Sequence, residues 1–251
     1  MKQNSLVSVI MAAYNAEVHV ESAIRSVLNQ TYNNFELIVV DDASSDSTLK
    51  KIEKLSKFDS RIKVYTNIAN RGVVNSRNFA TKKAQGKYIA FLDSDDLWLP
   101  EKLNKQIGCA QRENIPLLFS GYYKITPNEV MRGEVKVPKS VDYQKLLKSN
   151  YMGCLTVMYD QEKMEKFYFE EINMSEDYLL WLQMLKKIKK AVSVQEPLAK
   201  YRVASRTRAS NKFKAVFYQW RIYRDYENLN IFDAFYYFLH YIIIGYRRYI
   251  I

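Results

Sequence analysis

The chain has 251 residues, 48% of them hydrophobic and 26% charged, which is ample for a packed globular core. Its formal net charge of +11 suggests an anionic partner, but the excess is local. Residues 186–224 hold twelve Lys or Arg and one acid, which leaves twenty-six basic and twenty-six acidic residues elsewhere, as in an ordinary neutral enzyme domain.

Secretion and disulfide cross-linking are not indicated. The N-terminal sequence MKQNSLVSVIMAAYN has no signal-peptide pattern, since its short apolar stretch ends at a polar turn without a small-residue cleavage site. Cys109 and Cys154 lie in apolar surroundings without CxxC spacing, so neither a disulfide framework nor a zinc site is predicted. We therefore expect a cytoplasmic, reduced setting.

The first part of the chain alternates predicted strands and helices. Apolar, β-branched runs occur at residues 6–11, 35–41, 61–65 and 88–92. The stretches between them have helical spacing, as in residues 20–28 and 49–55. This order predicts an α/β fold with a Rossmann-like, mostly parallel sheet that is covered by helices on both faces.

Polar loops follow these runs, at residues 12–17, 41–48, 70–78 and 93–96. In a parallel sheet, ligands bind beyond the carboxyl ends of the strands, so the loops should meet in one site. No Walker A sequence is present and no GxGxxG follows a strand, so ordinary ATPase and dinucleotide-binding sites are not indicated.

The last loop, DSDD, places Asp93, Asp95 and Asp96 within four positions. Carboxylates this close raise one another's pKa and repel unless a cation or strong donors lie among them. A solvated acidic turn ahead of Pro100 is the alternative, but the position at the shared end of the strands favours a ligand site. Asp93 and Asp95 have DxD spacing, which suits Mg²⁺ or Mn²⁺ bound between carboxylates and the phosphates of a nucleoside diphosphate.

The second part of the chain has a weaker alternation and predicts a mixed α+β portion. Residues 117–125 and 154–160 read as strands, with a helix over 141–149 between them. A stronger helix follows in SEDYLLWLQMLKKIKK, with Ser175 as its expected N-cap and acids in its first turn.

The ordered motifs VSVIMAAYN, FELIVVDDASSDST, NRGVVNSRNFATKKAQGKYIAFLDSDD and SEDYLLWLQ resemble the inverting family 2 glycosyltransferases with the GT-A fold, especially bacterial enzymes of O-antigen and capsule assembly. The resemblance covers about residues 5–205. It implies a catalytic domain at 1–205, with a nucleotide-sugar-binding half at 1–97 and an acceptor half at 98–205, followed by a helical extension at 206–251.

For the nucleotide sugar, the resemblance implies a nucleoside pocket formed by the backbone of Ala12, Ala13 and Tyr14 together with Glu17. Asp42 would accept the N3–H of uracil, which favours UDP because uracil donates at that position. The alternative for Asp42 and for Asp46 is that they cap the helix that begins near residue 46.

For the diphosphate and the sugar, the resemblance implies that Arg77 lies near the base or the phosphates. Asp93, with Ser94, would lie near the ribose and the sugar, and Asp95 would bind Mn²⁺ or Mg²⁺. Arg77 could instead be a solvated helix residue.

Asp177 matches the family's catalytic base in the motif SED, where it would take the proton from the acceptor hydroxyl as that oxygen attacks the anomeric carbon. Glu176 and Asp177 could alternatively do no more than complement the helix dipole, which is typically worth ~0.3 to 1 kcal/mol.

Some positions depart from the family pattern. Ala13 stands where a proline often precedes the Tyr-Asn pair, and Ala204 lies near the place of a histidine that can reach the metal. The histidines of this chain, His19 and His240, are expected elsewhere, in structural roles. Metal binding would then rest mainly on Asp95 and depend on the nucleotide. The QxxRW pattern of processive synthases is missing, so we expect one sugar per encounter.

The C-terminal residues 213–251 are basic and aromatic, and their longest apolar stretch is too short to span a bilayer. Tyr and Trp mixed with Lys and Arg suit a membrane interface. Packing on the catalytic domain or in a homodimer is the alternative. The resemblance implies an undecaprenyl-diphosphate-linked saccharide as acceptor, so we expect peripheral association with the cytoplasmic membrane.

Two other functional classes are alternatives to a glycosyltransferase. A nucleic-acid-binding protein would account for the charge and the aromatic residues but not for the acidic loops, and no binding motif is recognisable. A nucleotidyltransferase that forms a sugar nucleotide would need a glycine-rich phosphate loop near the N-terminus, which MAAYNAE is not.

Overall fold

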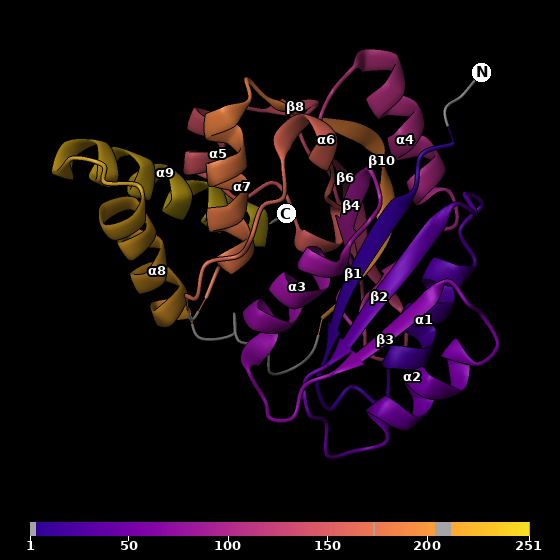
Figure 1. Ribbon diagram of the computed structural model, residues 1–251. Coiled ribbons are helices and arrows are strands. Elements are labelled where there is room, and N and C mark those ends of the chain that lie inside the picture. The colour runs from indigo at the N-terminus through magenta and orange to yellow at the C-terminus, as the bar shows by residue number, and fades with distance from the viewer. Residues whose placement is uncertain (1–3, 173, 204–211, 251) are drawn as a thin grey trace.

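The computed structural model in Figure 1 describes residues 4–172, 174–203 and 212–250. The strands are β1 Val7–Ala13, β2 Phe35–Asp41, β3 Ile62–Thr66, β4 Tyr88–Phe91, β5 Leu97–Trp98, β6 Leu117–Ile125, β7 Met131–Val135, β8 Ser140–Val141, β9 Met158–Asp160 and β10 Ala191–Arg202. The helices are α1 Val20–Leu28, α2 Thr48–Ser56, α3 Gly72–Lys83, α4 Lys102–Glu113, α5 Tyr143–Lys148, α6 Gln161–Met164, α7 Glu176–Lys187, α8 Lys212–Arg221 and α9 Ile231–Ile250, with a 3-10 helix at Cys154–Thr156 and a π-helix at Ile222–Tyr226.

These residues form one ten-stranded sheet in the order β3-β2-β1-β4-β9-β6-β10-β5, with β7 paired to β6 and β8 to β10. The first four strands in this order are parallel, as predicted. Beyond them β9 is antiparallel to both β4 and β6, so the sheet becomes mixed where the second part of the chain joins it. The fold is the expected α/β architecture, with a mixed α+β half.

Both faces of the parallel part are covered, which explains why its strands are apolar almost throughout. Alternate side chains point to opposite faces of a strand. Val9 and Met11 of β1 therefore pack in one core with α1, while Ile10 between them packs in a second core with α3. Figure 1 shows α1 and α2 on one side of these strands and α3 on the other.

Two local predictions for the second part of the chain need correction. The predicted strand 154–160 is a strand only over Met158–Asp160, because the N–H and the hydroxyl of Thr156 both donate to the carbonyl of Gly153, at 2.8 and 2.7 Å, and close a 3-10 turn. Ser175 does stand at the N-cap of α7, but its backbone is left-handed, with φ of 64°, and its hydroxyl caps no N–H. Side-chain capping usually needs an extended backbone at that position.

The C-terminal helices pack against α5 and α7 (Figure 1). Ile222, Tyr223 and Ala234 are buried in the core that also contains α5 and α7. Glu227, almost fully buried, accepts a hydrogen bond from the Tyr143 hydroxyl and pairs with Lys186 of α7 at 2.8 Å. Packing on the catalytic domain, one of the alternatives for this segment, is therefore present. The predicted boundary at residues 205 and 206 lies outside the described residues.

None of the helices in the described ranges combines the length and the apolar character that a bilayer crossing requires.

Candidate active site

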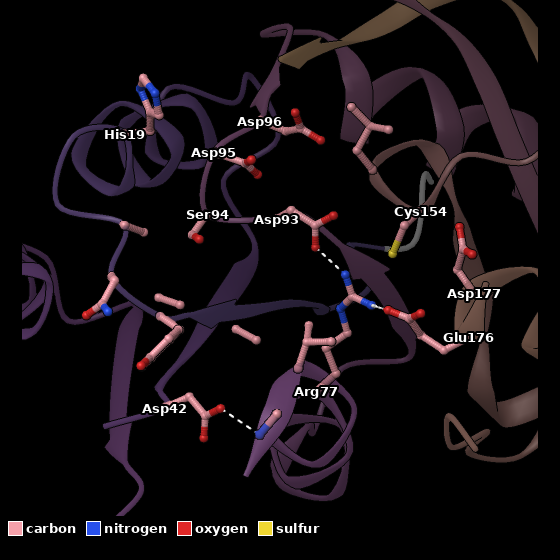
Figure 2. Close-up of a pocket in the computed structure, with 18 of the residues that line it drawn as sticks. His19, Asp42, Arg77, Asp93, Ser94, Asp95, Asp96, Cys154, Glu176 and Asp177 are labelled. Carbon is pink, nitrogen blue, oxygen red and sulfur yellow. Dashed lines mark hydrogen bonds and ion pairs between the residues drawn. The ribbon is translucent and has the colours of Figure 1, made fainter. Parts of the chain in front are cut away.

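A cavity of about 800 Å³ opens at the carboxyl ends of the parallel strands, where the polar loops were predicted to meet. Figure 2 shows its centre, with side chains from both halves of the chain facing one space. The lining residues are Ala12–Ala16, Val18, His19, Asp42, Asn70, Gly72, Val73, Arg77, Asp93–Asp96, Gly153–Leu155, Met174–Asp177 and Tyr201. All but one of the site residues predicted from the sequence are among them.

The exception is Glu17. Its carboxylate accepts the N–H of Ser47 at the start of α2, at 3.1 Å, and it does not line the cavity. Asp46 accepts the N–H groups of Glu17 and Thr48, so its carboxylate binds the first N–H of α2 from the position before the N-cap, Ser47. Together these bonds join the loop after β1 to α2 and leave the ring of Tyr14, which is 52% exposed, open to the cavity.

Asp42 is buried and holds the start of α3 rather than that of α2. Its two oxygens accept from the side-chain amide of Asn67 at 2.6 Å and from the N–H groups of Arg71 and Gly72 at 2.9 and 2.8 Å. Gly72 has φ of 84°, which only glycine adopts readily, so the residue type is required for this turn. The carboxylate is thereby fixed at the wall of the cavity.

Arg77 is 6% exposed, which excludes a solvated helix residue. Figure 2 shows its guanidinium between two carboxylates: it donates to Asp93 after β4 and, at 3.2 Å, to Glu176 at the start of α7. Burial alone would lower the pKa of Arg77, but these two carboxylates raise it well above its usual value. One cation therefore joins the loop after β4 to the start of α7.

The DSDD loop presents a carboxylate that no other described residue engages. Asp93 is paired with Arg77, and Asp96 accepts the main-chain N–H of Arg202 at 2.7 Å. Asp95 makes no side-chain hydrogen bond or ion pair to another residue of the described ranges, and burial together with the charge of Asp93 raises its pKa to about 6. An oxygen donor of this kind fits Mn²⁺ or Mg²⁺.

Asp95 would be the main protein ligand of such a cation. Within residues 4–172, 174–203 and 212–250, no cluster of three or more His, Cys, Asp or Glu side chains could hold a metal ion. The remaining ligands would have to come from the substrate phosphates and water, as is usual for these cations.

Asp177 lies across the cavity from the DSDD loop, at the start of α7 (Figure 2). Its carboxylate accepts the N–H of Tyr178 at 2.7 Å and has no other partner in the described part of the chain. Burial, and then the neighbouring charge of Glu176, raise its pKa to about 7. A carboxylate with such a pKa is suited to accept a proton near neutral pH.

Three of the lining residues that the sequence did not assign to a site carry polar or titratable side chains. His19 was predicted to lie elsewhere, yet it lines the cavity at the start of α1. Cys154 was described as having apolar surroundings, but it lines the cavity beside Arg77, Asp93 and Asp177, and burial raises the pKa of its thiol well above normal. Tyr201 reaches the cavity from β10. His19 follows the predicted loop 12–17 by two residues. No local pattern marks Cys154 or Tyr201, because tertiary folding brings them to the loops.

The arrangement can perform group transfer. Polar and charged groups at the strand ends can hold a nucleoside diphosphate, Asp95 can bind a cation on its phosphates, and Asp177 can deprotonate a hydroxyl that approaches from the acceptor half.

Comparison with known proteins supports this reading. The sequence model of glycosyl transferase family 2 matches residues 8–165. The chain is 43% identical, over 97% of its length and 94% of the relative, to the Escherichia coli UDP-Glc:alpha-D-GlcNAc-diphosphoundecaprenol beta-1,3-glucosyltransferase WfgD.

Two solved structures have the same fold. S. aureus TarS 1-349 in complex with UDP-GlcNAc superposes with a TM-score of 0.70 at 22% identity, over 82% of this chain and 60% of that one. The mannosyltransferase PcManGT from Pyrobaculum calidifontis, in complex with GDP-Man and Mn²⁺, superposes with a TM-score of 0.71 at 17% identity, over 90% of this chain and 65% of that one. At these identities the likeness concerns the GT-A fold.

Proposed function

The chain belongs to glycosyl transferase family 2, and from this premise we propose that it moves one sugar from a UDP-sugar to a hydroxyl of an undecaprenyl-diphosphate-linked saccharide, with inversion at the anomeric carbon. The observation that carries the proposal is the single cavity in which the DSDD loop and Asp177, far apart in sequence, face each other. The activity of the relative WfgD makes UDP-glucose the first donor and a GlcNAc-diphospholipid the first acceptor to test.

Each chemical role has a residue suited to it. Asp42 would accept the uracil N3–H, and the backbone of Ala12 to Tyr14 would line the base. Arg77 would lie near the base or the phosphates, and Asp93, with Ser94, near the ribose and the sugar. Asp95 would hold Mn²⁺ or Mg²⁺. When bound, the cation would stabilise the charge of the leaving diphosphate.

The reaction itself would need one proton transfer. Asp177 would take the proton of the acceptor hydroxyl while that oxygen forms the new bond to the anomeric carbon and the bond to UDP breaks. A single displacement from the face opposite UDP inverts the configuration. The name of WfgD specifies a β-1,3 linkage in its product, and inversion gives a β linkage when the sugar of the UDP-sugar is α-linked.

A peripheral position on the inner face of the plasma membrane is the second part of the proposal. On α9 an apolar stripe of exposed side chains stands opposite the buried Ala234; its members are Phe232, Phe235, Leu239, Ile242 and Ile243. The acceptor's polyprenyl chain stays in the bilayer, so the enzyme must come to the surface. The basic residues between 186 and 224 would attract anionic lipid. A second copy of the chain is the alternative occupant of the stripe.

The donor and the metal are tested together by a hydrolysis screen of UDP-sugars with Mn²⁺, because slow hydrolysis needs no correct acceptor. We expect UDP release with UDP-glucose, and Asp95→Asn should abolish the Mn²⁺ dependence of UDP binding. Release of pyrophosphate would instead favour the nucleotidyltransferase alternative. Metal-dependent UDP binding that survives Asp95→Asn unchanged would show that the metal assignment is wrong.

A further inference from the structure

Arg202, the last residue of β10, is 3% exposed and ties three segments together. Its main-chain N–H donates to Oδ1 of Asp96 at 2.7 Å, and its Nε donates to the main-chain oxygen of Asp95 at 2.7 Å. Nη1 donates to the main-chain oxygen of Pro127 at 2.5 Å, and Nη2 to Oε1 of Glu129 at 3.1 Å. The DSDD loop is thereby joined to the end of β10 and to the turn between β6 and β7.

The contact with Asp95 goes to its carbonyl and not to its carboxylate. An arginine that paired with the carboxylate would compete with a cation for the same oxygens. Arg202 avoids this competition, since it fixes the backbone of Asp95 and leaves the side chain to the cavity. At the other end of the loop, Arg77 holds Asp93 through its carboxylate. Two buried arginines thus hold the DSDD loop on either side of the Asp95 carboxylate, which no other described residue engages.

We propose that Arg202 is a positioning residue that presents the Asp95 carboxylate to a divalent cation by holding the DSDD backbone. The proposal rests on the proposed function, which gives Asp95 the metal. A ligand held by its surroundings binds a metal more tightly than one that must be ordered on binding, and loss of such a supporting contact typically weakens metal affinity about tenfold or more.

Electrostatic repulsion alone predicts the opposite change in Mn²⁺ affinity when Arg202 is removed. A guanidinium near the loop repels a cation, so its removal should tighten Mn²⁺ binding if charge were its only contribution. A weakening of Mn²⁺ binding on removal of Arg202 would therefore indicate positioning. This opposition of signs makes the affinity for Mn²⁺ a more telling readout than activity.

The experiment titrates Mn²⁺ into the full chain in saturating UDP and follows free Mn²⁺ by electron paramagnetic resonance. For Arg202→Gln we expect the dissociation constant of Mn²⁺ to rise about tenfold. Arg202→Lys, which keeps the charge but not the fork of donors, should also weaken binding. Lys200→Met removes a positive charge two residues earlier in β10 and should change the constant less than about twofold, as the matched control. In the Arg202 variants, the backbone amides of residues 93–96 should exchange their hydrogens with solvent faster than in the wild type.

Unchanged or tighter Mn²⁺ binding by Arg202→Gln, in a protein that still unfolds cooperatively, overturns the proposal. If neither Arg202 variant folds, Arg202 is a residue of core stability, and the proposal is wrong in that case too. Asp95→Asn is measured alongside: if it binds Mn²⁺ as the wild type does, the failure belongs to the metal assignment of the proposed function and not to Arg202.

Discussion

Glu176 and Asp177 are neighbours in sequence whose surroundings give them different chemistry. Glu176 pairs with the buried Arg77, so its charge is already neutralised within the protein. Asp177 accepts only the N–H of Tyr178 among the described contacts and faces the cavity with a pKa raised to about 7, first by burial and then by Glu176. Charge at the helix terminus would be complemented equally by either acid, but only Asp177 is left to take a proton.

Asp177→Asn should therefore lower the rate of sugar transfer by about 10²- to 10⁴-fold, the usual contribution of a general base. UDP binding, measured by calorimetry, should stay near the wild-type value, because the base acts on the acceptor and not on the nucleotide. Glu176→Gln is the paired control and should retain transfer above that of Asp177→Asn. If Glu176→Gln were instead less active in transfer than Asp177→Asn, Glu176 would be the base and not Asp177.

The same carboxyl predicts a pH profile. A base works only when deprotonated, so the transfer rate should rise about tenfold per pH unit below a pH near 7 and level off above it, following the pKa of Asp177. Single-turnover transfer at saturating donor between about pH 5 and 9 measures this. A transfer rate that does not change with pH over this range would show that Asp177 is not the base.

At the scale of elements, β5 and α4 support the 3-10 turn Cys154–Thr156 that lines the cavity. The indole N–H of Trp98 donates to the carbonyl of Leu155, and Gln106 donates to that of Thr156, both at 2.8 Å. Lys102, fully buried, donates to the side chain of Gln106 and lies over the Trp98 ring, 4.4 Å from its centroid. The turn beside Asp177 is thus held from behind by its main-chain oxygens.

Lys102 should make stability depend on pH. Burial lowers its pKa from 10.5 to about 7, so in that interval the unfolded chain holds a proton that the folded chain has released. Folding then becomes more favourable as pH rises, by up to about 1.4 kcal/mol per pH unit. Urea unfolding of wild type and Lys102→Met at pH 7 and about 9 should show this rise in the wild type and its absence from the variant. If the free energy of unfolding changes with pH in the same way in both proteins, the pKa of Lys102 is not lowered by burial.

The elements themselves were largely predictable from the sequence, and the misses have identifiable causes. The β-branched runs predicted the four parallel strands, because strands covered on both faces need apolar side chains throughout. The strand expected at 154–160 is present only over Met158–Asp160, because Thr156 donates a hydrogen bond to the carbonyl of Gly153, which a hydrophobic pattern does not encode. Cys154 enters the site through contacts between segments far apart in sequence, so no spacing rule could have placed it, whereas His19 lies only two residues after the predicted loop 12–17.

At the scale of the molecule, one face of the C-terminal helices stabilises the enzyme and the other remains available. Tyr223 and Ala234 are buried in the acceptor half, and Glu227 is tied to Tyr143 and Lys186. Deleting α9 would expose this core, so a truncation cannot separate folding from membrane contact. Surface substitutions on the apolar stripe of α9 can.

Phe235→Ser with Leu239→Ser should weaken binding to anionic vesicles by about thirtyfold, since each half-exposed side chain contributes ~1 kcal/mol of apolar burial. Binding by the wild type should fall with added salt. Co-sedimentation with anionic and neutral vesicles measures both effects, and hydrolysis of UDP-glucose should be unchanged.

The matched control for this pair removes two exposed apolar residues elsewhere, Phe58→Ser with Ile68→Ser. Figure 1 shows α2, which Phe58 follows closely, on the opposite side of the molecule from α9. If both pairs of substitutions weaken vesicle binding equally, or neither weakens it, the α9 stripe does not bind lipid. A change of the α9 pair from dimer to monomer in gel filtration would instead identify a second copy of the chain as the occupant.

The hydrogen bonds of Asp42 bear on how this enzyme can evolve. The carboxylate proposed to read the base also accepts the side-chain amide of Asn67 and the N–H groups of Arg71 and Gly72, so the helix that carries Arg77 depends on it. A mutation at residue 42 that adapted the pocket to another base would also remove the hydrogen bonds that hold the start of that helix. The helix could then shift and move Arg77 away from Asp93. If Asp42 binds the base as proposed, donor nucleotide preference would be protected against single mutations, and a lineage that exchanged UDP for another nucleotide would first need a substitute for the cap.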